Sequence, residues 1–190
     1  ESESELKNIK KIAEKFGKKV SVGLRLNPNI DAKTNTKIST GRIQDKFGLN
    51  GNDIIRILNK FKNSRNIKIK CLSVHIGSQI TQNKPYNSVL VAINKILSKS
   101  KYKFEYIDLG GGMGIKYIKD NKKLDYSKLS KNIHKFSKRN NCKIIFEPGR
   151  SIVGNTAVLL TKVIYIKNSS NKKFIIIDAG MNDLIRPALY

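Results

Sequence analysis

Apolar residues recur with a helical period at the start of the chain and with a strand period soon after it. In residues 4–17 they return every three or four positions and stop at a glycine, which predicts an amphipathic helix. Residues 20–26 alternate as in a strand, and residues 27–41 form a polar loop rich in turn-forming residues. A second helix is expected over residues 52–62, with Asn52 as its N-terminal cap.

The alternation of strand and helix patterns continues along the chain. We expect strands over residues 67–76, 104–109 and 143–147, separated by helices over residues 85–98 and 126–140. Such alternation indicates βα units and a mainly parallel sheet, because parallel neighbours need crossover connections. Two architectures remain open at this point, a (β/α)8 barrel and an open doubly wound sheet. Both place functional groups at the carboxyl ends of the strands.

The pattern changes after Arg150. Two β-rich runs, residues 156–167 and 173–180, are separated by a short polar segment, which predicts a hairpin or a meander rather than another crossover. We therefore expect an α/β domain over residues 1–152, followed by the start of an antiparallel β domain over residues 153–190. A lone hairpin is marginally stable, and four parallel strands do not close a barrel. The chain is thus expected to be part of a longer polypeptide.

The composition adds a strong positive charge to this picture. The chain has 190 residues, 39% of them hydrophobic, and its 38 Lys and Arg against 14 Asp and Glu give a net charge of +24. Such a charge can attract nucleic acid through counterion release. The lysines are spread along the whole chain, however, whereas a dedicated nucleic-acid module usually concentrates its charge on one element. We therefore favour solvated, lysine-rich surfaces over nucleic-acid binding.

Neither a membrane anchor nor a disulfide framework is predicted. No apolar run approaches the roughly twenty residues that span a bilayer, and the first residues lack the apolar core of a signal peptide. Cys71 and Cys142 stand singly in apolar runs, which is typical of unreactive core thiols. We expect a soluble, cytoplasmic protein with no membrane partner and no metal site.

Residues of special chemistry follow three of the predicted strands. At the end of the second strand, His75 could stack on a ring, transfer protons, bind a metal or be purely structural. After the third strand, Gly110, Gly111, Gly112 and Gly114 could bring backbone N–H groups close to an anion such as phosphate. Tight turns use the same residue type, so the glycine run alone is ambiguous.

The last of these strand ends carries Glu147, Pro148, Gly149 and Arg150. A carboxylate at the end of a buried strand needs a cationic or hydrogen-bonding partner, and an ion pair with Arg150 is the simplest one. The alternative is a ligand that all three strand ends contact together. A phosphorylated ligand with a basic ring nitrogen would suit the glycine run and Glu147, because a carboxylate beside a pyridine nitrogen keeps that nitrogen protonated. Pyridoxal phosphate meets both conditions.

Five motifs together are similar to those of a known enzyme family. They are, in chain order, VGLRLNPNIDAKT with DKFGL, then LSVHIGSQI, IDLGGGMGIKY, IIFEPGRSIVGNTAVLLTKV and DAGMNDLIRPALY. In this order they resemble the motifs of the diaminopimelate decarboxylases, which are fold type III pyridoxal-phosphate enzymes related to alanine racemase. The EPGR and HIGS elements also resemble those of ornithine and arginine decarboxylases.

The resemblance implies a fold and a role for each candidate residue. The fold would be α/β, a partial (β/α)8 TIM barrel followed by the start of an antiparallel β domain, with pyridoxal 5'-phosphate as the cofactor. The implied catalytic residues are His75, which would stack on the cofactor ring, and Glu147, which would pair with the ring nitrogen. The implied cofactor-binding residues are His75, Ser78, Gly111, Gly112, Glu147, Pro148, Gly149 and Arg150. The implied substrate-binding residues are Arg150, Arg186 and Tyr190.

The resemblance also implies a reaction and its partners. The family removes carbon dioxide from the D-configured centre of meso-diaminopimelate to give L-lysine, and it usually forms homodimers. The lysine that holds the cofactor covalently is expected before Glu1, and a motif with a catalytic cysteine is expected after Tyr190, so these residues alone should be inactive. Decarboxylation of ornithine or arginine, and nucleic-acid binding by a basic α/β protein, are the alternatives.

Overall fold

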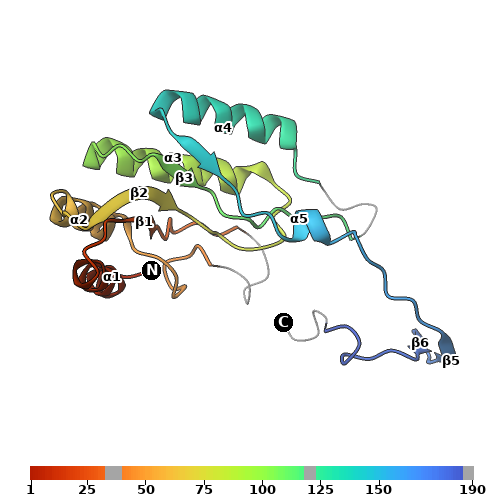
Figure 1. Cartoon of the computed structure of the whole chain (residues 1–190). Coiled ribbons are helices and arrows are strands. Elements are labelled where there is room, and N and C mark those ends of the chain that lie inside the picture. The colour runs from red at the N-terminus through yellow and green to blue at the C-terminus, as the bar shows by residue number, and fades with distance from the viewer. Residues whose placement is uncertain (33–39, 118–122, 186–190) are drawn as a thin grey trace. The chain divides into compact units, whose positions relative to one another are not determined.

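The computed structural model describes residues 1–32, 40–117 and 123–185 of the chain (Figure 1). The chain divides into two compact units, Glu1–Ile152 and Val153–Tyr190. Within the described residues, no helix has the length and apolar character that crossing a membrane requires.

The first unit is built on a four-stranded parallel sheet. Its strands lie side by side in chain order, and they are β1 (Val20–Arg25), β2 (Ile67–Ser73), β3 (Tyr106–Asp108) and β4 (Lys143–Ile145). The predicted parallel sheet is therefore confirmed. The last three strands end earlier than the apolar runs that predicted them. Single backbone hydrogen bonds still join the segments beyond the strand ends, such as the one from the Val74 N–H to the Asp108 carbonyl oxygen at 2.8 Å.

Four helices precede or connect these strands, and α3 and α4 lie together on one side of the sheet in Figure 1. The helices are α1 (Glu3–Lys15), α2 (Gly51–Phe61), α3 (Asn83–Ser100) and α4 (Tyr126–Asn140). The prediction that Asn52 caps the second helix is wrong. Asn50 is the cap, since its side chain accepts a hydrogen bond from the Asp53 N–H at 3.0 Å.

The hydrophobic core lies between the sheet and its helices. Ile54 and Ile57 of α2, Ile93 of α3, and Leu72 and Ile107 of the central strands are completely buried. Successive side chains of a strand point to opposite faces, so the burial of these positions assigns the intervening strand residues to the other face.

The register of the sheet places polar residues of different strands in one row. Arg25 pairs with Ser73, Ser73 with Asp108, and Asp108 with Ile145. On β1, β2 and β3 the residue just before each row member is buried in the core. Arg25, Ser73 and Asp108 therefore share the face that turns away from the core.

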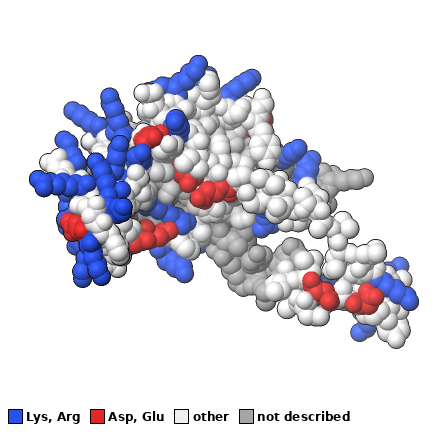
Figure 2. Space-filling model, in the orientation of Figure 1, with Lys and Arg blue, Asp and Glu red and all other residues white. Residues whose placement is uncertain are grey.

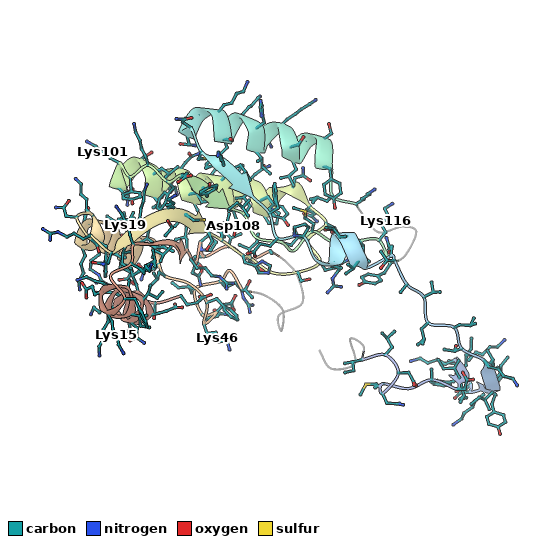
Figure 3. All side chains as sticks on the ribbon, viewed as in Figure 1. Lys15, Lys19, Lys46, Lys101, Asp108 and Lys116 are labelled. Carbon is teal, nitrogen blue, oxygen red and sulfur yellow. The ribbon has the colours of Figure 1, made fainter. Side chains whose placement is uncertain are left out.

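Basic residues gather at one end of the first unit. Figure 2 shows many Lys and Arg side chains over the region of α1 and α2, and Figure 3 marks Lys15, Lys19 and Lys101 at that end. Lys19 immediately precedes β1 and Lys101 immediately follows α3, so this is the end at which the strands begin. The candidate residues of the strand ends lie at the opposite end of the sheet.

The second unit contains an antiparallel hairpin. β5 (Val163–Asn168) pairs with β6 (Lys173–Ile177), which confirms the antiparallel β structure predicted after the barrel segment. A short helix that the sequence did not predict, α5 (Arg150–Val153), lies at the boundary of the two units. All residues of β5 and β6 are exposed within the described chain. A hairpin of this kind depends on further packing for its stability.

Candidate functional site

The carboxyl ends of the strands form a rim that contains most of the predicted residues. His75 lies two residues beyond the end of β2, Gly110 two beyond β3 and Glu147 two beyond β4. The Glu147 N–H donates a hydrogen bond to the Gly110 carbonyl oxygen at 2.9 Å. The three strand ends that the sequence singled out therefore lie next to one another.

A cavity of about 490 Å³ opens at this rim. Residues of all four strands or their carboxyl ends line it, together with Glu1: Gly23, Arg25, Ser73, Val74, His75, Asp108 and Glu147. Figure 3 marks Asp108 near the middle of the sheet. A larger cavity of about 1000 Å³, lined mainly by α2, α3 and the loop before α2, contains none of the predicted site residues. The smaller cavity is therefore the candidate site.

The loop after β3 requires glycine because the backbone of neighbouring segments lies against it. A Cβ atom on Gly111 would lie 2.3 Å from the Glu147 carbonyl oxygen, and one on Gly112 would lie 2.2 Å from the Gly77 carbonyl oxygen. Gly110 has a φ of +64°, and a Cβ atom there would lie 2.8 Å from His75 Nδ1. The close approach of neighbouring backbone thus explains these glycines.

Ser78 lies in a turn that runs beside the glycine loop. The Ile80 N–H, at the end of this turn, donates to the Gly112 carbonyl oxygen at 2.8 Å. From the other side, the hydroxyl of Tyr86, a buried residue of α3, donates to the Gly111 carbonyl oxygen at 2.8 Å. These bonds hold the turn and the glycine loop in a fixed relation to each other.

His75 is partly buried and is held in one tautomer. Its Nδ1 accepts a hydrogen bond from the Gly111 N–H at 3.2 Å, so the proton of the neutral imidazole is on Nε2. Burial, followed by the positive charge of Arg25, lowers the pKa of His75 from its ordinary value, while Asp108 acts in the opposite direction. The rim therefore presents a neutral imidazole ring.

We expect nitrogen-15 NMR of the full-length protein at neutral pH to show His75 with its proton on Nε2, with the exposed His134 of α4 as a reference signal. A proton on Nδ1 at neutral pH would contradict this assignment of the tautomer.

The lowered pKa of His75 also has a consequence for stability. The unfolded chain protonates this histidine near pH 6.5, before the folded protein does, so folding stability should fall as the pH drops below that value.

Glu147 has Asp108 as its main neighbour rather than Arg150. The negative charge of Asp108, followed by partial burial and a hydrogen bond between the two side chains, raises the pKa of Glu147, while Arg25 lowers it. Arg150 instead donates to the Tyr117 hydroxyl at 2.7 Å. Among the described residues, no ion pair joins Glu147 and Arg150, so that interpretation of the sequence is wrong.

The remaining predicted residues differ in how well the structure defines them. Pro148 and Gly149 connect Glu147 to α5, and a Cβ atom on Gly149 would contact nothing within 4 Å. Packing within the described chain therefore does not require glycine at this position. Arg186 and Tyr190 lie outside the described residues, and their roles stay predictions.

Three charged residues of the cavity were missed by the sequence reasoning. They are Glu1, Arg25 and Asp108. Arg25 donates to the Glu1 carboxylate at 2.6 Å, and its guanidinium lies 4.8 Å from the centre of the Phe47 ring. The signal that could have found Arg25 and Asp108 is their place on otherwise apolar strands, opposite the buried face.

The two cysteines take no part in the polar chemistry of the site. Burial raises the pKa of the Cys71 thiol to about 11, and burial also raises that of Cys142. Both are free thiols, in keeping with the unreactive character expected from the sequence.

Comparison with known proteins adds an independent observation. The model of a family described as "Pyridoxal-dependent decarboxylase, pyridoxal binding domain" matches residues 1–154. The chain is 41% identical to the diaminopimelate decarboxylase of Zymomonas mobilis, over 100% of this chain and 46% of that protein. It is 39% identical to the diaminopimelate decarboxylase of Aquifex aeolicus, again over 100% of this chain and 46% of that protein.

Solved structures show the same likeness. The diaminopimelate decarboxylase of Helicobacter pylori, complexed with L-lysine, matches with a TM-score of 0.90 and 37% identity, over 100% of this chain and 48% of that one. The resemblance and the fold class predicted from the sequence are confirmed. The chain spans about half the length of the relatives it matches.

Proposed function

Because the chain belongs to the pyridoxal-dependent decarboxylase family, we propose that it forms part of the coenzyme pocket of a diaminopimelate decarboxylase. The coenzyme of this family is pyridoxal 5'-phosphate, which confirms the cofactor predicted from the sequence. The full-length protein removes the carboxylate from the D-configured centre of meso-diaminopimelate and releases L-lysine. The L-lysine complex of the Helicobacter pylori relative supports this choice of product.

The cavity at the strand ends fits the coenzyme in two respects. The glycine loop at the same rim carries no side chains, so a phosphate can approach its backbone. Two carboxyl groups, those of Asp108 and Glu147, line the same cavity and suit a basic ring nitrogen. No lysine lines the cavity within the described residues, so we assign the amine that holds the coenzyme to another part of the full-length protein.

Different residues of the rim contact different parts of the coenzyme. His75 stacks on the ring, and its neutral state avoids a repulsion between two cations when the ring nitrogen is protonated. Ser78, Gly111 and Gly112 hold the phosphate, since they belong to the paired turn and glycine loop. Glu147 pairs with the ring nitrogen, and Pro148 and Gly149 shape the backbone beside it.

Besides holding the coenzyme, this chain contributes to the reaction in two ways: it keeps the ring nitrogen protonated and it binds the substrate. When bound, the coenzyme supplies an electron sink for the electron pair that carbon dioxide leaves behind. Glu147 keeps a proton on the ring nitrogen, because its carboxylate stabilises the cation. Arg150, together with Arg186 and Tyr190, binds the substrate, since guanidinium groups pair with carboxylates in a bidentate geometry.

The observation that carries this proposal is the convergence of three strand ends. His75 and Glu147 line one cavity, the Gly111 N–H donates to His75 Nδ1 at 3.2 Å, and the Glu147 N–H donates to the Gly110 carbonyl oxygen at 2.9 Å. The test is to load the full-length protein with pyridoxal phosphate and to measure carbon dioxide release and L-lysine formation from meso-diaminopimelate. We expect turnover with this substrate and little with L-ornithine or L-arginine. Turnover of ornithine or arginine in its place would favour the related decarboxylases.

The nucleic-acid alternative is disfavoured by the acidic residues that lie among the lysines at the amino-terminal end of the strands (Figure 2). Glu3, for example, accepts a hydrogen bond from Lys60 at 2.6 Å. Duplex binding much tighter than that of an equally basic unrelated protein, with a steep salt dependence, would reverse this judgement.

The organisation of the whole protein is proposed on the same basis. We assign residues 1–152 to the coenzyme-binding barrel and residues 153–190 to the start of a β domain. We also propose a homodimer and a cytoplasmic location, with a small amino-acid substrate as the partner and no role for a membrane. Sedimentation of the full-length protein would test the dimer.

A further inference from the structure

Two carboxyl groups of neighbouring strands lie side by side in the cavity. Asp108 is the last residue of β3, and its register partner on β4 is Ile145, so Glu147 is the next residue on the same face. Asp108 accepts a hydrogen bond from the Gly110 N–H at 2.8 Å through Oδ1. Both carboxyl groups line the same cavity, and the negative charge of Asp108 is the main cause that raises the pKa of Glu147. Two carboxyl groups so placed can share a hydrogen bond when one of them carries a proton.

We propose that Asp108 is a positioning residue that keeps a proton on Glu147 in the coenzyme-free protein, and that Glu147 passes this proton to the ring nitrogen of the coenzyme. The inference rests on the proposed function. In this step the O–H bond of the Glu147 carboxyl group breaks and its electron pair stays on the carboxylate. The lone pair of the ring nitrogen forms the new N–H bond.

The charges around the pair explain why one proton is retained. The titratable groups that line the cavity or act on the pair are Glu1, Arg25, Cys71, His75, Asp108 and Glu147. Glu1 and Arg25 form an ion pair at 2.6 Å, and the lowered pKa of His75 and the raised pKa of Cys71 keep both side chains neutral at neutral pH. Two adjacent carboxylates without a further cation repel each other, which favours the retention of one proton between them. A protonated ring nitrogen beside Glu147 supplies that cation.

The substitution Asp108→Asn separates this role from a structural one. The amide oxygen of asparagine can still accept the hydrogen bond from the Gly110 N–H, so the glycine loop keeps its anchor. Only the negative charge is lost. If Asp108 served the loop alone, asparagine would replace it without consequence for Glu147.

The first measurement uses the full-length, coenzyme-free protein with carbon-13 in its glutamate carboxyl groups. Asp108→Asn should shift the titration of Glu147 to lower pH, because the repulsion that retains the proton is gone. Arg25→Gln should shift it to higher pH, since Arg25 acts on Glu147 in the opposite direction. Glu105→Gln, which removes an acid near the amino end of the same strand, is the matched control and should leave it unchanged.

The second measurement loads the same proteins with pyridoxal phosphate that carries nitrogen-15 in its ring. In Asp108→Asn we expect the ring nitrogen to lose its proton about one pH unit lower than in the unsubstituted protein. An unchanged Glu147 titration in Asp108→Asn would overturn the inference. If that variant does not fold, a shift to lower pH in Arg25→Gln would overturn it as well. A full-length protein that binds no coenzyme would contradict the proposed function, while the carboxyl titration would still decide the inference.

Discussion

Glu147→Gln in the full-length protein is expected to lower kcat by about a hundred- to ten-thousand-fold, the range found for removal of a group that controls a catalytic proton. Glutamine has the size of glutamate, but it places a neutral amide beside the ring nitrogen. The nitrogen then loses its proton at neutral pH, and the electron sink weakens. Coenzyme binding should persist, because the phosphate contacts of the glycine loop are untouched.

Two measurements on Glu147→Gln check this expectation. Turnover of meso-diaminopimelate gives kcat, and nitrogen-15 NMR of the bound coenzyme gives the protonation of its ring. Glu105→Gln is the matched control, since Glu105 lies near the amino end of β3 and pairs with Lys70 at 3.1 Å. A near-normal kcat, or a ring nitrogen that stays protonated in Glu147→Gln, would remove the role assigned to this carboxyl group.

Much of this site could be predicted from the sequence, because the apolar runs show where each strand begins and which residues follow it. The apolar runs fixed where β2 and β4 begin, and their alternation with helices predicted a parallel sheet. In a parallel sheet all carboxyl ends meet at one edge, so His75, Gly111 and Glu147 were expected together. The helical pattern also predicted α4 with the bounds that the structure has, since Asp125 caps it and Asn141 ends it in a left-handed conformation.

The pairing inside the site could not be predicted, because it depends on register. Nothing in the linear sequence shows that Asp108 is aligned with Ile145 and therefore adjoins Glu147. The sequence instead offered Arg150, three residues away along the chain, as the partner. In the structure α5 begins at Arg150, and this side chain bonds Tyr117 from the distant glycine-loop segment. Proximity along the chain was thus a poor guide to the partner of a charge at a strand end.

The choice of cap for α2 failed for a local reason. Asn50 and Asn52 both precede the apolar stripe of the helix, and asparagine is favoured at a cap in either position. The cap is decided by which side chain can reach the N–H three residues on, and Asn50 reaches Asp53. Composition alone does not separate two such candidates.

Gly112→Ala is expected to destabilise the full-length protein by about 2–5 kcal/mol and to weaken coenzyme binding. Gly112 has a φ of +88°, which side chains other than glycine rarely adopt, and the new methyl group would lie 2.2 Å from the Gly77 carbonyl oxygen. The neighbour is backbone and cannot move aside as the end of a flexible side chain can. Relief requires the glycine loop and the turn that carries Ser78 to separate, which would open the phosphate site.

Urea unfolding and a fluorescence titration with pyridoxal phosphate measure the two effects of Gly112→Ala. Gly51→Ala, at the start of α2, is the matched control, because its methyl group would meet only the flexible side chain of Ile96 and no positive φ is involved. It should change the free energy of unfolding by less than about 1 kcal/mol and leave coenzyme affinity unchanged. If Gly112→Ala behaved like this control, the close approach of the two segments would have no part in forming the phosphate site. The glycine run would then be explained by the turn alone.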